Sequence, residues 1–350
     1  MGVPFATLGS RRISSEDPCY IIAEIGVNHN GDIDLAHKMI DAAKAAGADA
    51  VKFQTFRTDD LVTAAAQKAE YQSETTGAGS QADMLRRLEL PIAAFEALRR
   101  HCVSVGVDFM STAFDPISLE AVISLGPICL KWPSGELNNL AMLRQAARSK
   151  LPVMLSTGMG SVTEISVAVD QLAAEGCDEV IILQCVSNYP ARIEDQNLRV
   201  IPALSQVFGR PVGFSDHTIG PFAAIAARAL GMSVLEKHFT LDRTMAGPDH
   251  AASIEPDQFV ELVSTLRAIE TGLGDGVKRP MPSEAGVRAV ARKSLAFRRA
   301  LPKGHVLSED DLAAKRPGTG ISPDRLEMFI GLPLVRDVVR DELLTVEHVR

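Results

Sequence analysis

Two histidines follow a pair of apolar runs that predict neighbouring strands. The run at residues 211–214 leads to His217, and the run at residues 233–237 leads to His238. Residues 219–230 between them are Ala-rich with helical periodicity, so the segment predicts a strand, a helix and a second strand. The two strands of such a unit are parallel, so both histidines reach the carboxyl edge of one sheet. Two imidazoles placed there could share one divalent metal.

Polar and charged residues also end the other predicted strands, where a purely structural sheet would need none. They are Glu24, Lys52, Gln54, Ser111, Thr112, Lys131, Ser134, Glu136, Ser187, Asn188, Tyr189, Ser215, Asp216, Glu236 and Lys237. Alternate residues of a strand face opposite sides, so Lys52 and Gln54 share a face, as do Glu236 and His238. Lysines and hydroxyls beside two histidines fit a phosphorylated or carboxylated substrate next to a metal.

Simpler structural roles fit each of these residues taken singly. A lone lysine or glutamate on a strand also fits an ion pair inside the fold, and a histidine also fits a buried structural position. His29 lies in a turn-like loop at residues 27–32, where it is either a turn former or a substrate contact. Trp132 is predicted to pack in the core. The convergence of many polar residues at one sheet edge favours a functional site.

A repeated strand, loop and helix pattern must position these residues. Eight candidate strands cover residues 20–25, 50–55, 107–112, 128–132, 153–157, 179–185, 212–215 and 234–239. Eight such units over roughly 250 residues predict a closed α/β barrel. A doubly wound open sheet is the alternative, but no G-x-G-x-x-G follows the first strand. A polar insertion at residues 57–81 is expected to be a lid or a dimer contact.

The chain is predicted to divide into a barrel domain and a small C-terminal domain. The barrel domain covers residues 1–275, and its last covering helix is expected at residues 254–273. A linker at residues 276–291 follows, indicated by the Gly-Asp-Gly at residues 274–276 and the Pro-Met-Pro at residues 280–282. Residues 292–350 contain short strands and turns, and so small a domain would gain from packing against something larger.

Composition narrows the function classes. Of 350 residues, 46% are hydrophobic, 23% charged and 5% aromatic, and the mean hydropathy is +0.08, as expected for an α/β core. The net charge of −8 gives no indication of a nucleic-acid or anionic membrane partner. No apolar run reaches membrane-spanning length, and the first residues do not have the pattern of a secretion signal. Five scattered cysteines suggest reduced core residues and a cytoplasmic protein.

Several motifs, in order along the chain, resemble those of the sialic acid synthases. The matching segments are residues 23–32, 51–54, 131–136, 156–159, 185–190, 214–218, 236–239 and 247–249, together with the Arg-Pro-Gly-Thr-Gly turn at residues 316–320. This family condenses phosphoenolpyruvate (PEP) with N-acetylmannosamine or a related sugar. The resemblance implies a (β/α)8 TIM barrel followed by a small antifreeze-like (SAF, β-clip) domain, and it covers nearly the whole chain.

Residue roles also follow from the resemblance. It implies Mn²⁺ or Mg²⁺ on His217 and His238, with Arg316 reaching the sugar of the partner subunit in a domain-swapped homodimer. PEP contacts are expected at Lys52, Gln54, Thr112, Lys131, Ser134, Ser187 and Ser215. Sugar contacts and proton transfer are expected at Glu24, Glu136, Tyr189 and Asp249, and Lys131 is also expected to be catalytic. Asn188 could replace Ser187 as the phosphate contact, because this segment varies in the family.

The expected reaction joins C3 of PEP to an aldehyde carbon, and water addition then releases phosphate. Lys52 and Lys131 would neutralise the phosphate and carboxylate. Either Glu24 or Glu136 would stabilise the cation at C2 and position the water, and the sequence does not decide between them.

Three alternatives stay open. A legionaminate synthase would use the 2,4-diacetamido-6-deoxymannose acceptor, and only a few pocket residues separate it from an N-acetylneuraminate synthase. A Schiff-base aldolase would use Lys52, Lys131 or Lys237 as the carbonyl trap. A non-enzymatic carbohydrate- or ice-binding protein is suggested only by the C-terminal domain.

Overall fold

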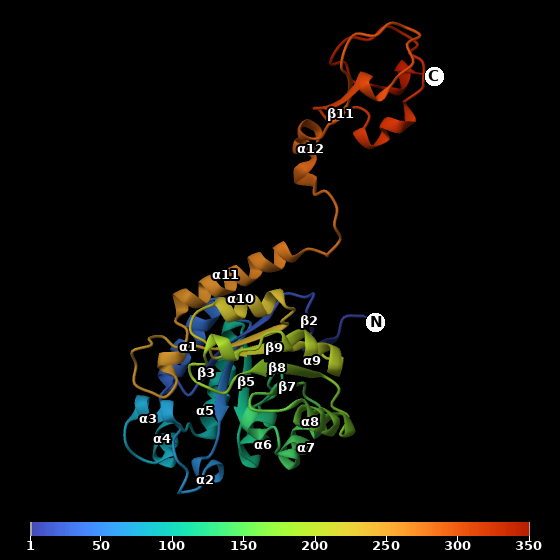
Figure 1. The fold of residues 1–350 in the computed structure, drawn as a ribbon. Coiled ribbons are helices and arrows are strands. Elements are labelled where there is room, and N and C mark those ends of the chain that lie inside the picture. The colour runs from blue at the N-terminus through green and yellow to red at the C-terminus, as the bar shows by residue number, and fades with distance from the viewer. Residues whose placement is uncertain (1, 350) are drawn as a thin grey trace. The chain divides into compact units, whose positions relative to one another are not determined.

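Eight parallel strands close into a barrel, which confirms the predicted fold class. The computed structural model describes residues 2–349, and its contacts divide the chain into two units, Met1–Gly274 and Asp275–Arg350. Around the barrel the strand order is β10-β3-β4-β5-β6-β7-β8-β9 (Figure 1). The strands are β3 (Tyr20–Gly26), β4 (Ala50–Thr55), β5 (Asp108–Ala113), β6 (Leu130–Trp132), β7 (Val153–Ser156), β8 (Val180–Cys185), β9 (Val212–Asp216) and β10 (Val234–His238).

Helices that follow the strands cover the outside of the barrel. They are α1 (Ile33–Ala45), α5 (Ile92–Val105), α6 (Pro116–Ser124), α7 (Leu140–Arg148), α8 (Val162–Ala174), α9 (Val200–Phe208), α10 (Phe222–Ala229) and α11 (Pro256–Leu273). Local sequence sets their starts. The Asp32 side chain accepts hydrogen bonds from the first backbone amides of α1, and Pro256 occupies the first turn of α11.

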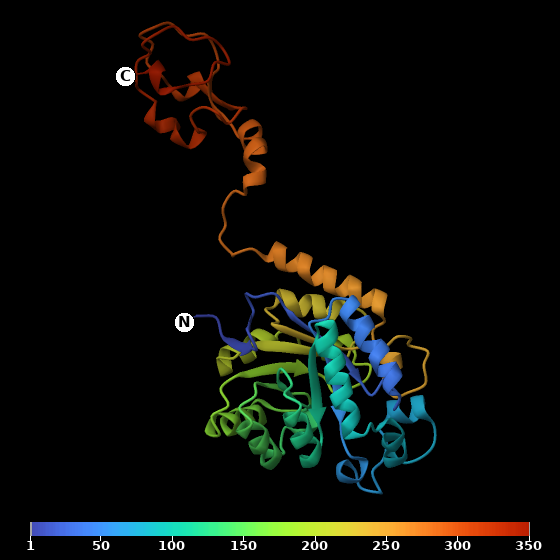
Figure 2. The same ribbon diagram turned by 180° about the vertical axis from the view of Figure 1, so that it is seen from behind.

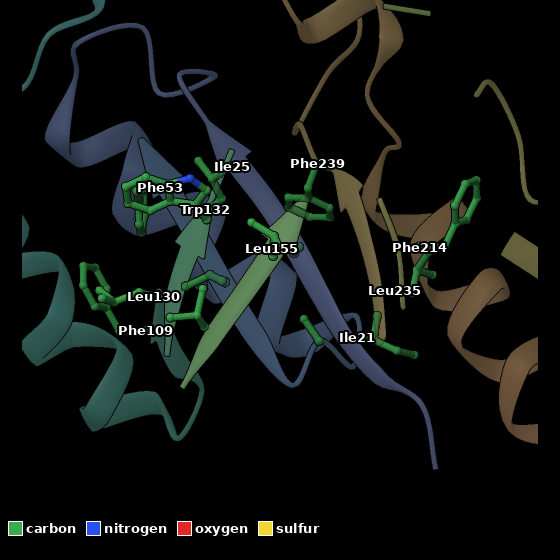
Figure 3. Packing of buried hydrophobic residues seen from close by; sticks show 14 of the residues in the cluster. Ile21, Ile25, Phe53, Phe109, Leu130, Trp132, Leu155, Phe214, Leu235 and Phe239 are labelled. Atoms are coloured by element: carbon green, nitrogen blue, oxygen red, sulfur yellow. The ribbon is translucent and has the colours of Figure 1, made fainter. Parts of the chain in front are cut away.

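The main core lies between the strands and the covering helices. Strand residues such as Phe53, Trp132 and Phe239 point outward into it and are at most 1% exposed (Figure 3). Trp132 therefore packs in the core, as predicted. Because strand side chains alternate, the residues between these apolar positions face the inside of the barrel, as Lys52 and Gln54 do on either side of Phe53.

An N-terminal hairpin seals the amino end of the barrel. The sequence analysis did not anticipate this hairpin, formed by β1 (Phe5–Leu8) and β2 (Arg11–Ser14). Its buried residues Ala6, Leu8 and Ile13 join Tyr20, Ile22, Ala50, Met110, Cys129, Met154, Ile181, Leu183 and Val234 from the lower barrel in one apolar cluster. All five cysteines of the chain are buried and unpaired, as expected for reduced core residues.

The insertion after β4, residues 57–88, folds as three short helices. They are α2 (Thr58–Leu61), α3 (Glu70–Thr76) and α4 (Gln81–Leu88), which gather on one side of the barrel in both ribbon views (Figures 1 and 2). The insertion has its own apolar cluster, in which Met84 and Leu88 pack on Val27 and Phe56. No buried residue comes from α3 among the part of the chain that is described.

The second unit has a core of its own. It contains a short helix, α12 (Ala285–Ala291), and two antiparallel strands, β11 (Ser294–Phe297) and β12 (Leu312–Lys315). Its core includes Leu295, Phe297, Leu301, Leu307, Leu312, Phe329, Leu334, Val338 and Leu344. The predicted linker at residues 276–291 thus includes α12, which sequence reasoning did not anticipate.

Short 3-10 helices complete the chain at η1 (Ser134–Glu136), η2 (Ile193–Asp195), η3 (His250–Ala252), η4 (Pro282–Glu284), η5 (Glu309–Asp311), η6 (Pro323–Met328) and η7 (Val346–His348). Among the described helices, none is long and apolar enough to cross a membrane.

Candidate active site

A polar cavity of about 260 Å³ opens at the carboxyl ends of the barrel strands. All but two of the site residues predicted from the sequence line it: Glu24, Lys52, Gln54, Thr112, Lys131, Ser134, Ser187, Tyr189, Ser215, His217, His238 and Asp249. The carboxyl ends of barrel strands carry the active sites of TIM-barrel enzymes. The cavity is therefore the candidate active site.

Strand register brings these residues into rows across the barrel wall. His238 of β10 pairs with Glu24 of β3, and Glu24 pairs with Lys52 of β4. One step further along the strands, Thr112 of β5 pairs with both Gln54 and Lys131. Residues far apart in sequence thus become neighbours because the barrel is closed and its strands are in register.

A bulge at the end of β3 orients the row formed by His238, Glu24 and Lys52. The register between β3 and β4 shifts between Glu24 and Gly26. Gly26 has a φ of +55°, and a Cβ there would lie 3.1 Å from Gln54 Nε2 and 3.2 Å from Glu24 Oε1. Only glycine combines this backbone conformation with so close an approach of two site residues.

Two buried lysines and two buried glutamates form the floor of the cavity. Lys52 Nζ lies 2.8 Å from Glu24 Oε1 and 3.7 Å from Glu236 Oε2, and it donates a hydrogen bond to Thr112 Oγ1. Lys131 Nζ lies 3.3 Å from Glu236 Oε1. Glu24 Oε2 and Glu236 Oε2 are buried without a hydrogen-bond partner. The floor therefore keeps hydrogen-bonding capacity for a bound molecule.

The two glutamates titrate in opposite directions. Burial raises the pKa of Glu24, and the negative charge of Glu236 adds to the rise despite the attraction of Lys52. Burial also acts to raise the pKa of Glu236, but Lys131 and Lys52 outweigh it and hold that pKa well below its usual range. Two carboxyls with separated pKa values can play different parts in proton transfer, with Glu24 the more readily protonated of the two.

His217 and His238 face each other with ring centroids 5.5 Å apart. Burial lowers the pKa of both imidazoles, to about 4 for His217. His217 Nδ1 donates to the Val186 carbonyl at 2.7 Å, so Nε2, which lies 3.3 Å from Ser215 Oγ, carries the lone pair that a ligand would use. His238 Nδ1 is buried without a hydrogen-bond partner.

Neutral imidazoles with available lone pairs fit a divalent metal, so the donor set suits the expected ion. No cluster of three or more His, Cys, Asp or Glu ligands occurs among residues 2–349. Water and substrate oxygens would have to complete the coordination. Asp249 Oδ2 lies 3.9 Å from His238 Nδ1, and burial, with Glu24 adding to it, raises the pKa of Asp249 to about 7.

Small polar groups surround Gly158 and form an anion cradle. Gly158 N donates to Ser134 Oγ at 2.9 Å, and Ser134 Oγ lies 3.1 Å from Cys185 Sγ. A Cβ on Gly158 would collide with Ser134, Cys185 and Ser187. Ser156 Oγ is buried without a partner and also lines the cavity. Hydroxyls gathered around an open backbone suit the oxygens of a phosphate or carboxylate.

Two predicted site residues do not line the cavity. Glu136 Oε2 accepts a hydrogen bond from Asn139, and the Glu136 carbonyl accepts one from Trp132 Nε1. Glu136 thus stabilises the turn after β6, and its part in proton transfer stays a prediction. Arg316 belongs to the second unit, where its Nε donates to the Ala291 carbonyl.

The structure also distinguishes between roles that the sequence left open. Lys237 points to the other face of β10, where its Nζ binds Asp216 Oδ2 at 2.8 Å, so it does not line the cavity. His29 Nδ1 accepts from Gly31 N at 3.0 Å, which is the contact of a turn former. Ser187 lines the cavity, whereas Asn188 does not.

Sequence reasoning missed the residues that the insertion contributes. Tyr71, Gln72, Met84, Leu85 and Leu88 line the cavity. The ring centroids of Tyr71 and Tyr189 are 5.4 Å apart, and those of Tyr189 and His217 are 4.1 Å apart. No local pattern marks these residues, because their approach to the barrel is set by tertiary packing alone. Glu236 was noted as a polar strand residue, but it received no role.

The fold and the cavity together define a class, a (β/α)8 barrel whose mouth holds paired lysines, an anion cradle and two histidines. Comparison with known families identifies the family within this class. The profile of the NeuB family matches residues 39–278, and that of the SAF domain matches residues 292–350. The chain therefore belongs to the NeuB family, is an enzyme of the sialic acid synthase type, and carries a C-terminal SAF domain, as the sequence motifs indicated.

Relatives along nearly the full length of the chain agree with this assignment. An N,N'-diacetyllegionaminic acid synthase from Legionella pneumophila is 43% identical over 346 residues, 97% of each chain. Human N-acetylneuraminate-9-phosphate synthase is 34% identical over 341 residues, 97% of this chain and 95% of its own. The crystal structure of an N-acetylneuraminic acid synthetase from Leptospira borgpetersenii superposes with a TM-score of 0.72 at 34% identity, covering 81% of this chain and 95% of its own.

Proposed function

We propose that this enzyme condenses PEP with N-acetylmannosamine, or a related 2-acetamido sugar, and water to give a nine-carbon sugar acid and phosphate. One observation carries the proposal: two buried lysines and an anion cradle lie in the same cavity as two metal-competent histidines. A doubly anionic substrate needs the first two features, and activation of an aldehyde suits the third. The names of the relatives support the same reaction class.

PEP would occupy the deep part of the cavity. Lys52 and Lys131 would neutralise its charges, and the hydroxyls of Thr112, Ser134, Ser187 and Ser215, with Gln54, would orient its oxygens. The unpartnered Ser156 Oγ adds a further donor that the sequence analysis did not assign. Fixed donors of this kind stabilise developing charge without having to reorganise.

His217 and His238 would hold a divalent ion such as Mn²⁺ or Mg²⁺. A bound ion of this kind supplies Lewis-acid polarisation of the acceptor carbonyl. The protein itself keeps both imidazoles neutral through burial and fixes the His217 tautomer through Val186. These two features prepare the ligands before an ion arrives.

Glu24 would manage the proton transfers that follow carbon–carbon bond formation. Its pKa is raised, it lies against Lys52, and one of its oxygens is unpartnered inside the cavity. Water must reach the cation at C2 before phosphate leaves, and a carboxyl at this place could position that water. Asp249 and Tyr189 would contact the sugar near the histidines.

The acceptor has two candidates. N-acetylmannosamine is the first, and the 2,4-diacetamido-6-deoxy sugar is the second, because legionaminic acid synthases are among the most similar relatives. The aldolase alternative is weaker, since Lys237 lies outside the cavity and both cavity lysines are engaged with glutamates. We further propose that Arg316 reaches the sugar of a partner subunit in a domain-swapped homodimer, and that the enzyme is cytoplasmic.

The test is phosphate release from PEP by purified enzyme with Mn²⁺ and either sugar, each repeated with EDTA. We expect sugar-dependent release that EDTA abolishes, with the sugar acid identified by mass spectrometry. A borohydride-trapped lysine adduct with EDTA-insensitive turnover would instead establish the aldolase. Sugar binding without turnover would establish a carbohydrate-binding protein.

A further inference from the structure

The cavity has two walls of different chemistry. The barrel strands supply the lysines, glutamates, hydroxyls and histidines. The insertion supplies the facing wall with Tyr71, Gln72, Met84, Leu85 and Leu88. Three of these five side chains are aliphatic, and this wall lies outward from the strand ends where the reacting atoms would be held.

The aliphatic part of this wall is fixed in place. Met84 and Leu88 of α4 are each 6% exposed and form one cluster with Val27 and Phe56 of the barrel. Leu85 packs against the same cluster and is half-buried. Because α4 is anchored by its own core, the wall presents a constant apolar surface to the cavity.

Charge in the cavity disfavours an anion at this wall. Among the described residues that line the cavity, Lys52 and Lys131 are the only cationic side chains, and both are engaged by glutamates on the floor. On the insertion, Arg86 pairs with Asp59, while Lys68 and Arg87 line a second cavity rather than this one. A phosphate pressed against Met84 and Leu85 would lose its hydration without meeting a cationic side chain that lines this cavity wall.

The reaction orients the acceptor against this wall. Its aldehyde carbon must meet PEP near the lysines and histidines of the floor, so its remaining carbon atoms extend outward. There they reach the cavity lining formed by the α4 side chains and by the Tyr71 and Tyr189 rings, whose centroids are 5.4 Å apart. An apolar substituent gains free energy from burial there, and a charged one loses it.

We propose that α4, through Leu85 with Met84 and Leu88, selects an uncharged acceptor whose far end carries a methyl group, the 6-deoxy class of 2-acetamido sugar, and rejects an acceptor phosphorylated at C6. This inference depends on the proposed synthase activity, and it assigns the acceptor choice to the insertion rather than to the strand ends. Leu85 is the specificity-determining residue, because it lines the cavity without being fully buried in the cluster.

The first test compares kcat/KM with PEP and Mn²⁺ for three acceptors: N-acetylmannosamine, its 6-phosphate and 2,4-diacetamido-2,4,6-trideoxymannose. We expect the trideoxy sugar to exceed N-acetylmannosamine by about tenfold and the 6-phosphate by at least about a hundredfold. If the 6-phosphate is used as well as either of the others, the inference fails while the synthase function stands. If no acceptor releases phosphate, the proposed function fails, and the inference falls with it.

The second test uses a matched pair of variants. Leu85 and Leu61 both pack on the same cluster, but only Leu85 lines the cavity. We expect Leu85→Gln to lower the preference for the trideoxy sugar over N-acetylmannosamine by about tenfold, whereas Leu61→Gln leaves this ratio unchanged. Leu85→Met, which conserves volume and polarity, should keep the ratio and control for misfolding. Equal changes in both glutamine variants, or none in Leu85→Gln, would overturn the assignment.

Discussion

Lys131 and Lys237 show how the same residue type takes different roles on the two faces of a strand layer. Both are at most 5% exposed, and each is within 3.3 Å of a carboxylate. Lys131 faces the cavity and Lys237 faces away from it. The two lysines are therefore a natural pair for separating a structural loss from a functional one.

Replacing either lysine by methionine removes the nearest cation from a buried carboxylate, although Glu236 keeps Lys52 at 3.7 Å and the Ser215 hydroxyl. We expect Lys131→Met and Lys237→Met each to lower the free energy of unfolding by about 3–5 kcal/mol. Only Lys131→Met should raise the KM for PEP, by at least about tenfold, because only that charge faces the substrate. Chemical denaturation and phosphate-release kinetics measure the two effects. An equal rise in KM for Lys237→Met would contradict the assignment of the PEP site.

Asp249 makes a pH-dependent contribution to stability. Burial raises its pKa to about 7, well above the usual range of an aspartate, so the folded state retains a proton that the unfolded state releases at lower pH. Stability from this group is full below the unfolded pKa and is lost as the pH rises to about 7. With EDTA present, we expect Asp249→Asn to unfold at nearly the wild-type temperature at pH 4.5 but at a higher temperature at pH 8.

At pH 8, the free energy of unfolding of Asp249→Asn should exceed that of the wild type by about 2–4 kcal/mol. Thermal unfolding at several pH values measures it. A variant that is destabilised equally at both ends of the pH range would show that the carboxylate is ionised in the folded protein.

At the scale of elements, the positions of two site residues depend on one glycine in the bulge at the end of β3. Gly26 and Gly209 both have positive φ, at +55° and +60°, but a Cβ at Gly209 would meet nothing within 4 Å. The two positions thus share the same backbone requirement and differ in crowding.

Gly26→Ala and Gly209→Ala should therefore share a stability loss of roughly 1–2 kcal/mol from the left-handed backbone. Gly26→Ala should additionally lower kcat at least about tenfold, because the new methyl displaces Gln54 and Glu24 from their positions. Unfolding and steady-state kinetics on both variants check this. Wild-type kcat in Gly26→Ala would mean that the bulge does not position the site.

The sequence was sufficient for the strands, since all eight lie within two or three residues of their predicted bounds and most of the polar residues that end them line one cavity. The alternation of side chains along each strand is a local pattern, so it can be recognised in the sequence. The hairpin β1–β2 and the inner face of the insertion were not predicted, because their places depend on contacts with distant segments. The hydrogen bond from Asn139 to the Glu136 carboxylate was not predicted either, because the motif position of Glu136 gives no sign of it.

At the scale of the whole molecule, the chain has two cores in two units. Residues 271–281, at the boundary between them, are exposed throughout. Limited proteolysis there should give a barrel fragment that unfolds cooperatively and is stabilised thermally by PEP. If Arg316 completes the sugar site, the same fragment should release no phosphate when sugar is added. Full turnover by the fragment would show that catalysis does not require the SAF domain.

The hairpin that seals the amino end of the barrel also bears on the order of events during turnover. With that end closed, substrates enter and products leave through the mouth at the carboxyl ends of the strands. If PEP binds at the floor and the sugar at the outer wall, as proposed above, a sugar that arrives first obstructs the path of PEP. The enzyme should therefore follow an ordered sequential scheme in which PEP binds first, the sugar acid departs before phosphate, and excess sugar inhibits competitively against PEP.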